Sequence, residues 1–406
     1  MKIRSIHTQD AGPLATQVFD LKDSWSDQIA SRVLFSGPNG TGKSAMLRAT
    51  ATLWGAFGHW LHARSPLPAR TSDHDWLRQW GGFALVLEQT PYGASPLVLV
   101  HGASDFVEHL ERLYPDHALV GERAPCSADG RSAGRELIWH PQGLRLDDWA
   151  EARHRMLVSP EGGGSPNLIF LDAEERRWVK PRRGMGEIKP EDLGQRWLAG
   201  YHASEQWEGQ LEASLLALKA AAPERFFGLV HDMNGFLSGK AIRTEVRVGE
   251  NRIRVALDDR ADSIHGLDDL SAGEHQVLIQ IYMVGRWLEP GGIVLIDEPD
   301  LHLHPSLIPG FLSRLEQMVA ARDGQLFITS HVPDIWSRYE ALGQRILLGA
   351  TTVAHAVSLP VPARPTRVPR GIGGARQPEV EASAGRRPTQ TRYNRAVNPS
   401  LSEPDT

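Results

Sequence analysis

Apolar residues recur along residues 1–350 in short blocks that predict strands and helices in turn. Continuous apolar runs predict buried strands at 32–36, 83–87, 168–171, 293–296 and 326–329. After the first strand, a helix is predicted by residues at close to helical spacing, Leu47, Ala51, Trp54, Phe57 and Leu61. Another helix is predicted from Ser271, ahead of the fourth strand. This alternation is typical of an α/β protein with a mixed or parallel central sheet.

The middle of the chain has a less regular pattern. Residues 91–165 show no clear period and are not assigned. The apolar positions from Leu193 to Leu218 favour one long helix that begins at Pro190 and ends at Pro223.

Pattern and composition together predict how the chain is organised. Residues 1–350 form one domain, with a main lobe at about 1–90 and 225–350 and an inserted α-rich lobe at about 91–224. Residues 351–406 hold eight of the 27 prolines and eight arginines against four acidic residues. Such a segment buries too little apolar surface to offset the entropy of ordering it, so we expect a disordered tail. The favoured interpretation is a dispensable extension, and the alternative is a segment that docks a partner or tethers a nucleic acid.

The composition of the whole chain excludes several classes of protein. With 41% hydrophobic residues, 23% charged residues and a net charge of −5, the 406 residues are typical of a globular protein without an overall basic field. The single cysteine, Cys126, excludes an intramolecular disulfide and argues against a cysteine zinc site. No apolar run is long enough to span a membrane, and the N-terminus lacks an apolar signal core. We expect a cytoplasmic protein without a membrane partner.

A glycine-rich segment follows the strand predicted at 32–36. It matches the phosphate-loop (Walker A) pattern G-x-x-x-x-G-K-[ST] in full, with Gly37, Pro38, Asn39, Gly40, Thr41, Gly42, Lys43 and Ser44. Glycines let the backbone wrap a phosphate, and successive N–H groups and the start of the next helix face the anion. Lys43 supplies a positive charge for the β and γ phosphates, and the Ser44 hydroxyl is a ligand for Mg²⁺. The segment therefore predicts binding of ATP with Mg²⁺.

Two carboxylates follow the strand predicted at 293–296. Asp297 and Glu298 come directly after it, and ligands of open α/β sheets bind at the carboxyl ends of the strands. A strand that simply ends in a polar turn is the plain alternative. Because a phosphate loop is present, we interpret the pair as a Walker B motif. Asp297 then holds Mg²⁺ through its water shell, and Glu298 acts as general base on the attacking water.

The helix predicted from Ser271 begins with a segment that has two interpretations. Ser271 and Glu274 are spaced as a capping box, which by itself needs no further role. The run Leu270-Ser271-Ala272-Gly273-Glu274 also resembles the signature motif of the ABC-type ATPase superfamily, with Ala272 where many members carry glycine. Both interpretations can hold, because a capped helix start with a glycine is also an anion site.

This resemblance implies an assembly and further site residues. In the superfamily, the segment at Ser271–Glu274 contacts the γ-phosphate bound by a second subunit, so the chain is expected to close as a homodimer around two ATP molecules. His331, at the end of a predicted strand, is similar to the family's switch histidine, which contacts the γ-phosphate and the water. Gln89, after another predicted strand, is the candidate for the family's glutamine loop and its metal contact.

The spacing of the motifs and one further run indicate a branch of the superfamily. Ser271 lies 227 positions after Ser44, too far for a transporter subunit and too near for the long coiled coil of chromosome-structure ATPases. The run Glu298-Pro299-Asp300-Leu301-His302-Leu303-His304-Pro305 resembles that of the RecF/OLD-like AAA family ATPases. OLD-type proteins append a TOPRIM nuclease domain. No cluster of acids after His331 could form a two-metal site, so we expect no nuclease here.

A basic stretch follows the strand predicted at 168–171. Its members, which flank Trp178, are Arg176, Arg177, Lys180, Arg182 and Arg183. One interpretation is a nucleic-acid contact with an aromatic partner. The favoured interpretation is a solvated surface loop, because neighbouring acids dilute the positive field.

Residues and resemblance together predict a P-loop NTPase, an ABC-type ATPase head that uses ATP and Mg²⁺ as a dimerisation switch. DNA, or an effector protein encoded separately, is the expected receiver of the switch. Roles in DNA repair or phage defence are analogies. The alternative hypothesis is a regulatory module that uses ATP as a slow timer for a partner toxin or nuclease and does not contact DNA.

Overall fold

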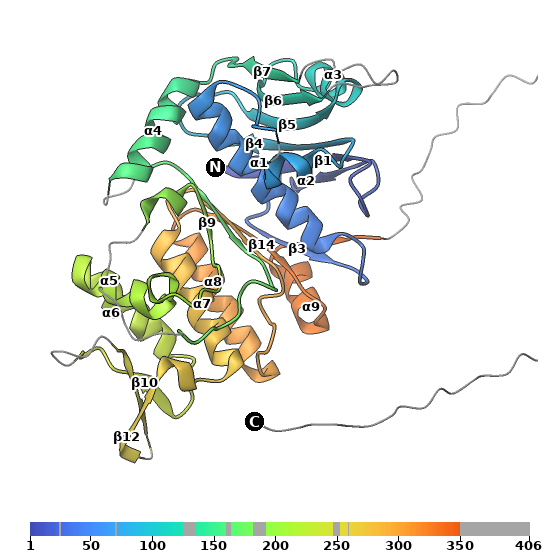
Figure 1. Cartoon of the computed structure of the whole chain (residues 1–406). Coiled ribbons are helices and arrows are strands. Elements are labelled where there is room, and N and C mark those ends of the chain that lie inside the picture. The colour runs from blue at the N-terminus through green and yellow to red at the C-terminus, as the bar shows by residue number, and fades with distance from the viewer. Residues whose placement is uncertain are drawn as a thin grey trace, which may run out of the picture. The chain divides into compact units, whose positions relative to one another are not determined.

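Two six-stranded sheets form the framework of the molecule (Figure 1). The computed structural model describes residues 1–23, 26–69, 71–124, 135–159, 164–181, 192–246, 252–258 and 260–349. These residues lie in one unit, Met1–Thr351. Cys126, Pro190 and the segment expected as a tail, 351–406, lie outside the described residues.

The central sheet is parallel throughout its described strands. In spatial order these are β15 (Gln344–Leu347), β3 (Arg32–Ser36), β14 (Gln325–Thr329), β13 (Ile293–Ile296), β8 (Leu168–Leu171) and β9 (Leu198–Gly200). Every neighbouring pair runs in the same direction. The α/β class with a parallel central sheet is therefore confirmed, and the strands predicted at 32–36, 168–171 and 293–296 have the predicted bounds.

A second sheet is largely antiparallel and comes mostly from the first third of the chain. In spatial order its strands are β2 (Gln17–Asp20), β1 (Lys2–Gln9), β4 (Gly82–Glu88), β5 (Leu97–Ala103), β6 (Ala118–Ala124) and β7 (Glu136–His140). Only β5 and β6 run parallel. Helix α3 (Ser104–Leu113) covers one face with Phe106, Val107 and Leu110, against Val86 and Val98.

Helix α1 (Lys43–Ala63) lies between the two sheets (Figure 1). Its apolar residues share one core with inward residues of both sheets, which include Phe83 and Leu99 on one side and Leu295 and Phe327 on the other. Because α1 is surrounded, its apolar surface is broad, and Trp54, Phe57 and Trp60 are all buried. The predicted helical stripe from Leu47 to Leu61 is confirmed.

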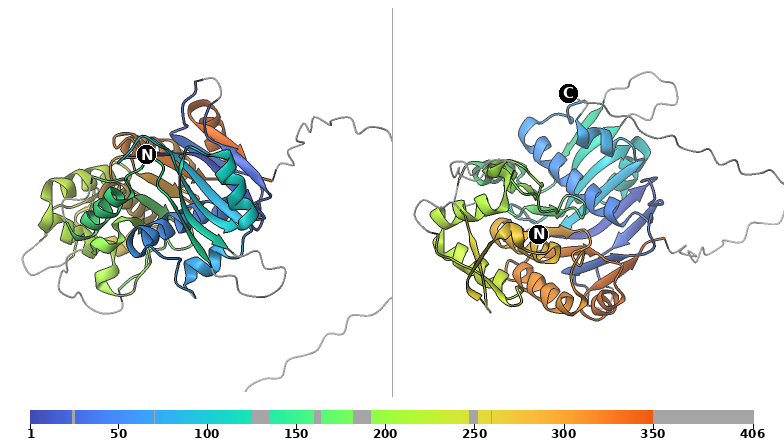
Figure 2. Two further views of the ribbon diagram at one scale, coloured as in Figure 1. Left: turned by 90° about the horizontal axis from the view of Figure 1, so that it is seen from above. Right: turned by 60° about the horizontal axis from the view of Figure 1, so that its bottom comes forward.

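Alternate residues of the central strands face a second core on the other side of the sheet. In β13, Ile293 and Leu295 face α1, whereas Val294 and Ile296 face α7 (Ala272–Trp287) and α8 (Ile308–Ala320). This alternation follows from the period of two in a strand that is covered on both faces. Figure 2 shows α7 and α8, in gold and orange, beside the green helices α5 and α6.

The remaining described elements are short. They are α2 (Ser72–Leu77), α4 (Leu146–Val158), α5 (Leu211–Ala221), α6 (Pro223–Asn234), α9 (Pro333–Leu342), and the strands β10 (Lys240–Ile242), β11 (Arg254–Leu257) and β12 (Arg260–Gly266), which form a small antiparallel sheet. Single 3-10 turns occur at Leu193–Arg196, Trp207–Gly209, Leu267–Asp269 and Pro305–Leu307. In the part of the chain that the structure describes, no helix combines the length and apolar character needed to cross a bilayer.

The single long helix predicted up to Pro223 is wrong. Residues 198–200 instead form β9, which pairs in parallel with β8 at the sheet edge, and α5 begins only at Leu211. Pro223 is the first residue of α6 rather than the end of a longer helix. Pairing at the sheet edge overrides the local helical pattern, because it satisfies backbone groups and buries apolar side chains.

Residues 91–224, expected as one inserted lobe, are divided among three places. Strands β5, β6 and β7 extend the antiparallel sheet, β8 and β9 extend the central sheet, and α5 packs against α6. The helical part of the molecule thus continues past residue 224 into α6 and α7, which share one core with α5. Long-range strand pairing, which leaves no local signature in the sequence, decides this division.

The stacked pair of Trp54 and Trp197 generates a test of the core between the sheets. Their ring centroids are 4.4 Å apart, and each indole N–H donates to the other residue's carbonyl, at 2.8 and 3.0 Å. We expect Trp54→Ala to lower the free energy of unfolding by about 3–5 kcal/mol, because it leaves a cavity and removes the hydrogen bond that the Trp54 indole donates. Chemical denaturation measures this. The control Val18→Ala, at a side chain that is 57% exposed, should change it by about 0.5 kcal/mol or less.

Candidate functional site

The loop between β3 and α1 is shaped by glycines in conformations that other residues avoid. Gly37 has φ 145° and Gly42, which caps α1, has φ 95°. A Cβ atom on Gly37 would lie 2.5 Å from the carbonyl oxygen of Leu348, and one on Gly42 would lie 2.8 Å from Leu14. Both glycines are thus required by backbone conformation and by space. The loop presents the uncapped N-terminus of a 21-residue helix, where unpaired N–H groups favour an anion.

The Lys43 side chain folds back across this loop. Its Nζ atom donates to the carbonyl oxygens of Gly37 at 3.1 Å and Pro38 at 3.0 Å, and the residue is only 6% exposed. Burial lowers the pKa of the Lys43 ammonium, and the carboxylates of Glu298 and Asp297 oppose that shift. The Lys43 ammonium is therefore held within the loop, where it interacts electrostatically with Glu298 and Asp297.

Residues from four separate segments line one cleft. They are Pro13, Asn39, Gly40, Gly42, Lys43, Ser44, Glu298 and His331. The parallel sheet explains this convergence, because β3, β13 and β14 are neighbours and each is followed by one of the predicted motifs. The structure therefore brings together the predicted phosphate loop, Glu298 and His331.

The pair Asp297–Glu298 is fixed by its neighbour on β14. Thr329 Oγ1 donates to Asp297 Oδ1 at 2.5 Å and accepts from the Glu298 N–H at 2.9 Å. Asp297 is 5% exposed, whereas the Glu298 side chain reaches the cleft, with Oε1 3.4 Å from His331 Nε2. Glu298 has a left-handed backbone, φ 48°. A positive φ is uncommon for a residue with a Cβ atom, so the surrounding contacts must hold it.

One residue of this site was not found from the sequence. Arg176 is fully buried, and its Nη2 atom donates to the carbonyl oxygens of Asp297 at 2.5 Å and Glu298 at 3.0 Å, while Nε donates to Asp172 at 3.1 Å. Burial lowers the pKa of the Arg176 guanidinium to about 10. Four nearby carboxylates, of which Asp297 has the largest effect, oppose this shift. Both interpretations of the basic stretch 176–183 are therefore wrong for Arg176. Arg176 comes shortly after the strand predicted at 168–171, and this position was the signal in the sequence that could have identified it. In the structure that strand is β8, which pairs with β13.

The predicted signature segment begins α7. Ser271 Oγ accepts from the Glu274 N–H at 3.3 Å, and Glu274 Oε2 accepts from the Ser271 N–H at 2.7 Å, so the capping box is confirmed. Burial disfavours the Glu274 carboxylate, but hydrogen bonds from Lys240 and Ser271 outweigh burial and lower its pKa. Ser271 and Ala272 are exposed and do not line the cleft of their own chain.

The structure does not bring Gln89 to the cleft. It follows β4, whose last residue Glu88 pairs with Lys2, and Lys2 forms an ion pair of 3.4 Å with Asp323. Asp323 precedes β14, so Gln89 lies toward the amino ends of the central strands, opposite the cleft. The residue that follows β8, the strand beside β13 in the central sheet, is Asp172 and not a glutamine.

The two histidines that follow the acids lie in the segment between β13 and α8. His302 has φ 65°, and His304 Nδ1 lies 2.8 Å from Ser306 Oγ. In the ranges the structure describes, no group of three histidine, cysteine or acidic residues could hold a metal ion.

A comparison with protein families identifies what this cleft belongs to. A family model described as "AAA domain, putative AbiEii toxin, Type IV TA system" matches residues 104–335, more than half of the chain. The chain belongs to this AAA-domain family. The matched region of this AAA-domain protein contains Asp297, Glu298, His331 and the start of α7, and it begins after the phosphate loop. The predicted recognition as an AAA family ATPase is confirmed.

Individual relatives are more distant. Protein ea59 of Escherichia phage lambda is 38% identical over 64 residues, which are 16% of this chain and 12% of that protein. An SMC head bound to the C-winged helix domain of ScpA is 13% identical at a TM-score of 0.45, over 82% of this chain and 91% of that one. The SMC head domain from Thermotoga maritima is 13% identical at 0.38, over 83% and 92%. A putative ABC transporter ATP-binding protein from Pyrococcus furiosus is 11% identical at 0.33, over 85% and 97%.

Gly273 generates a test of how the start of α7 is held. A Cβ atom there would lie 2.6 Å from the carbonyl oxygen of His302, whereas one on Gly228, within α6, meets nothing within 4 Å. Replacing a helical glycine by alanine ordinarily stabilises a protein by about 0.4–1 kcal/mol. We expect that gain for Gly228→Ala, and the opposite sign, a loss of about 1–3 kcal/mol, for Gly273→Ala. Denaturation of both variants measures the two signs, and equal stabilisation would contradict the close contact.

Proposed function

We propose that this protein binds ATP with Mg²⁺ and hydrolyses it to ADP and phosphate. The observation that carries the proposal is the single cleft that Lys43, Ser44, Glu298 and His331 line together. Chance would not join a complete phosphate loop with an acidic pair and a histidine from two neighbouring strand ends. Membership of the AAA-domain family supports the same conclusion.

Each side chain has a role that its chemistry fits. The loop N–H groups and Lys43 hold the β and γ phosphates. The Ser44 hydroxyl and the Asp297 carboxylate are hard oxygen donors, which suits them to hold Mg²⁺, and Mg²⁺ when bound neutralises charge on the phosphates. Glu298 accepts the proton of the attacking water, and His331, 3.4 Å from Glu298, contacts the γ-phosphate. Asp297 stays in place through its hydrogen bond from Thr329.

The start of α7 supports a second part of the proposal, a homodimer that closes around ATP. Ser271 and Ala272 are exposed at a helix N-terminus, the kind of surface that binds phosphate. They are absent from the lining of their own cleft, so a phosphate bound in that kind of cleft can contact them only when the cleft belongs to another copy. Two copies related by a two-fold axis complete both sites at once. ATP then biases a closed state, and hydrolysis releases it.

The receiver of this switch defines two candidate functions. The first is action on DNA, by analogy with the RecF/OLD-like branch. The second is an ATP-timed module that controls a partner toxin or nuclease, and the family description, which names a putative toxin and a toxin–antitoxin system, favours it. ATP turnover with added duplex or single-stranded DNA separates them. Stimulation supports the first, whereas no stimulation together with one stoichiometric co-purifying protein supports the second.

The base assignment predicts the behaviour of Glu298→Gln. ATP binding should remain within about twofold, because the amide keeps the shape of the side chain, and turnover should fall about 100-fold or more, because the amide cannot accept the proton. Binding is measured by titration with ATP and turnover by phosphate release. Turnover near that of the unaltered protein would show that another group is the base.

The dimer predicts that Glu298→Gln accumulates ATP-dependent dimers, measured by light scattering after size-exclusion chromatography. Adding Ser271→Arg to that variant should leave it monomeric with ATP, because a bulky cation then occupies the place of the shared phosphate contact. The matched control is Ser31→Arg, at an exposed residue before β3, on the opposite edge of the sheet. Dimers that persist with Ser271→Arg would exclude the shared site.

A further inference from the structure

The backbone at Glu298 is held from both sides. Its φ of 48° places it in the left-handed region, which costs about 1–3 kcal/mol for a residue with a Cβ atom unless the surroundings impose it. Thr329 accepts from the N–H of Glu298, and Arg176 donates to its carbonyl oxygen. The same Arg176 Nη2 atom also donates to the carbonyl oxygen of Asp297. The direction in which the Glu298 side chain leaves the strand thus depends on these two residues.

Arg176 makes two further contacts besides its hydrogen bonds to the carbonyl oxygens of the acidic pair. Its Nε atom donates to the carbonyl oxygen of Asp172, at the carboxyl end of β8, and its own carbonyl oxygen accepts from Gln276 Nε2 on α7. A guanidinium can join these groups because its N–H donors spread in a rigid plane. A lysine ammonium on a flexible chain cannot reach Asp172 and the two carbonyls of 297 and 298 in the same geometry.

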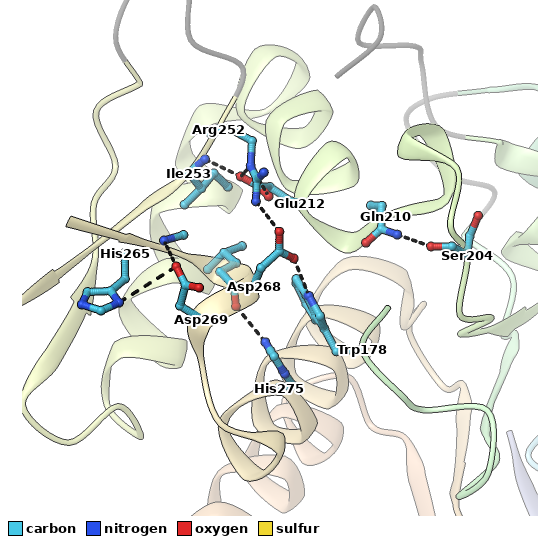
Figure 3. Close-up of polar contacts among 12 residues, drawn as sticks. Trp178, Ser204, Gln210, Glu212, Arg252, Ile253, His265, Asp268, Asp269 and His275 are labelled. Carbon is cyan, nitrogen blue, oxygen red and sulfur yellow. Dashed lines mark hydrogen bonds and ion pairs between the residues drawn. The ribbon is translucent and has the colours of Figure 1, made fainter. Parts of the chain in front are cut away.

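The segment that carries Arg176 continues into a second set of contacts (Figure 3). Trp178 stacks on His275 at 4.2 Å with an interplanar angle of 6°, and its indole N–H donates to Asp268 at 2.7 Å. Asp268 also accepts from Arg252, at 2.7 Å. Residues 172–178 are therefore anchored at the acidic pair on one side and at the beginning of α7 on the other, which leaves Arg176 little freedom to move alone.

We propose that Arg176 is a positioning residue that aims the Glu298 carboxylate at the attacking water by fixing the carbonyl groups of Asp297 and Glu298. The inference rests on the proposed function, because it takes Glu298 as the base. Arg176 is fully buried and does not line the nucleotide cleft, so it acts through Glu298 and not on ATP. Arg176 therefore affects the rate of ATP hydrolysis rather than the affinity for ATP.

The test is Arg176→Lys, which keeps the charge but loses the planar fork. We expect kcat for ATP to fall between about 10- and 100-fold, the range that misplacement of a catalytic group causes, while the KM and the Kd for ATP stay within about twofold. Arg177→Lys is the matched control, since Arg177 is the exposed neighbour of Arg176 and should leave kcat unchanged without added nucleic acid. A normal kcat for Arg176→Lys would overturn the inference.

A double variant separates positioning from a general loss of structure. Residual turnover of Arg176→Lys with Glu298→Gln should equal that of Glu298→Gln alone, because Arg176 has nothing left to aim. Multiplied losses would mean that Arg176 acts by another route and would overturn the inference. Normal turnover of Glu298→Gln by itself would overturn the base assignment, whereas an inactive Glu298→Gln beside a fully active Arg176→Lys would overturn the positioning role alone.

Chemical rescue supplies an independent readout. Arg176 lines a surface cavity together with Trp178 and His302, so a small cation can enter the space that Arg176→Ala leaves. We expect guanidinium chloride, well below denaturing concentrations, to restore part of the lost kcat, and sodium chloride at the same ionic strength to restore none. If Arg176→Ala does not fold, Arg176→Lys and the double variant decide. A folded Arg176→Ala that neither salt rescues would contradict the guanidinium geometry.

Discussion

Parallel pairing in register is the constraint on which the whole site depends. Ile296 of β13 pairs with Ile328 of β14 and with Leu171 of β8, and Ile328 pairs in turn with Leu34 of β3. All four strands therefore end at one edge of the sheet, and whatever follows each of them meets there. A phosphate loop, two acids, a histidine and a buried arginine reach one place from segments that are far apart in sequence.

Helix α1 belongs both to the core between the sheets and to the lining of the cleft. Its body is buried between the two sheets, with Trp54 stacked on Trp197, and its first residue is Lys43 in the cleft. The first N–H groups of a helix have no partner within it, and a rigid helix start keeps them pointing at one place. The surrounding core supplies that rigidity, so the start of α1, which we propose as the phosphate site, is held by packing rather than by a side-chain cap.

Helix α7 differs from α1 because its first residues are exposed. Its body is buried against the central sheet, but Ser271 and Ala272 at its tip are exposed, and Gly273 is pressed against the carbonyl oxygen of His302. Residues 172–178 join this helix to the acidic pair through Gln276, Arg176 and Trp178. The start of α7 and Glu298 are therefore linked by a short run of direct contacts.

The sequence by itself determined the features that depend on neighbouring residues. These are the strands at 168–171 and 293–296, the glycine loop before Lys43 and the capping box at Ser271, because turn chemistry and strand period act over a few positions. Only the tertiary structure decided that residues 198–200 form an edge strand, that Gln89 lies away from the cleft and that Arg176 is buried. Arg176 contacts residues 121 and 122 positions away, and hydrogen bonds over such distances leave no pattern along a single chain.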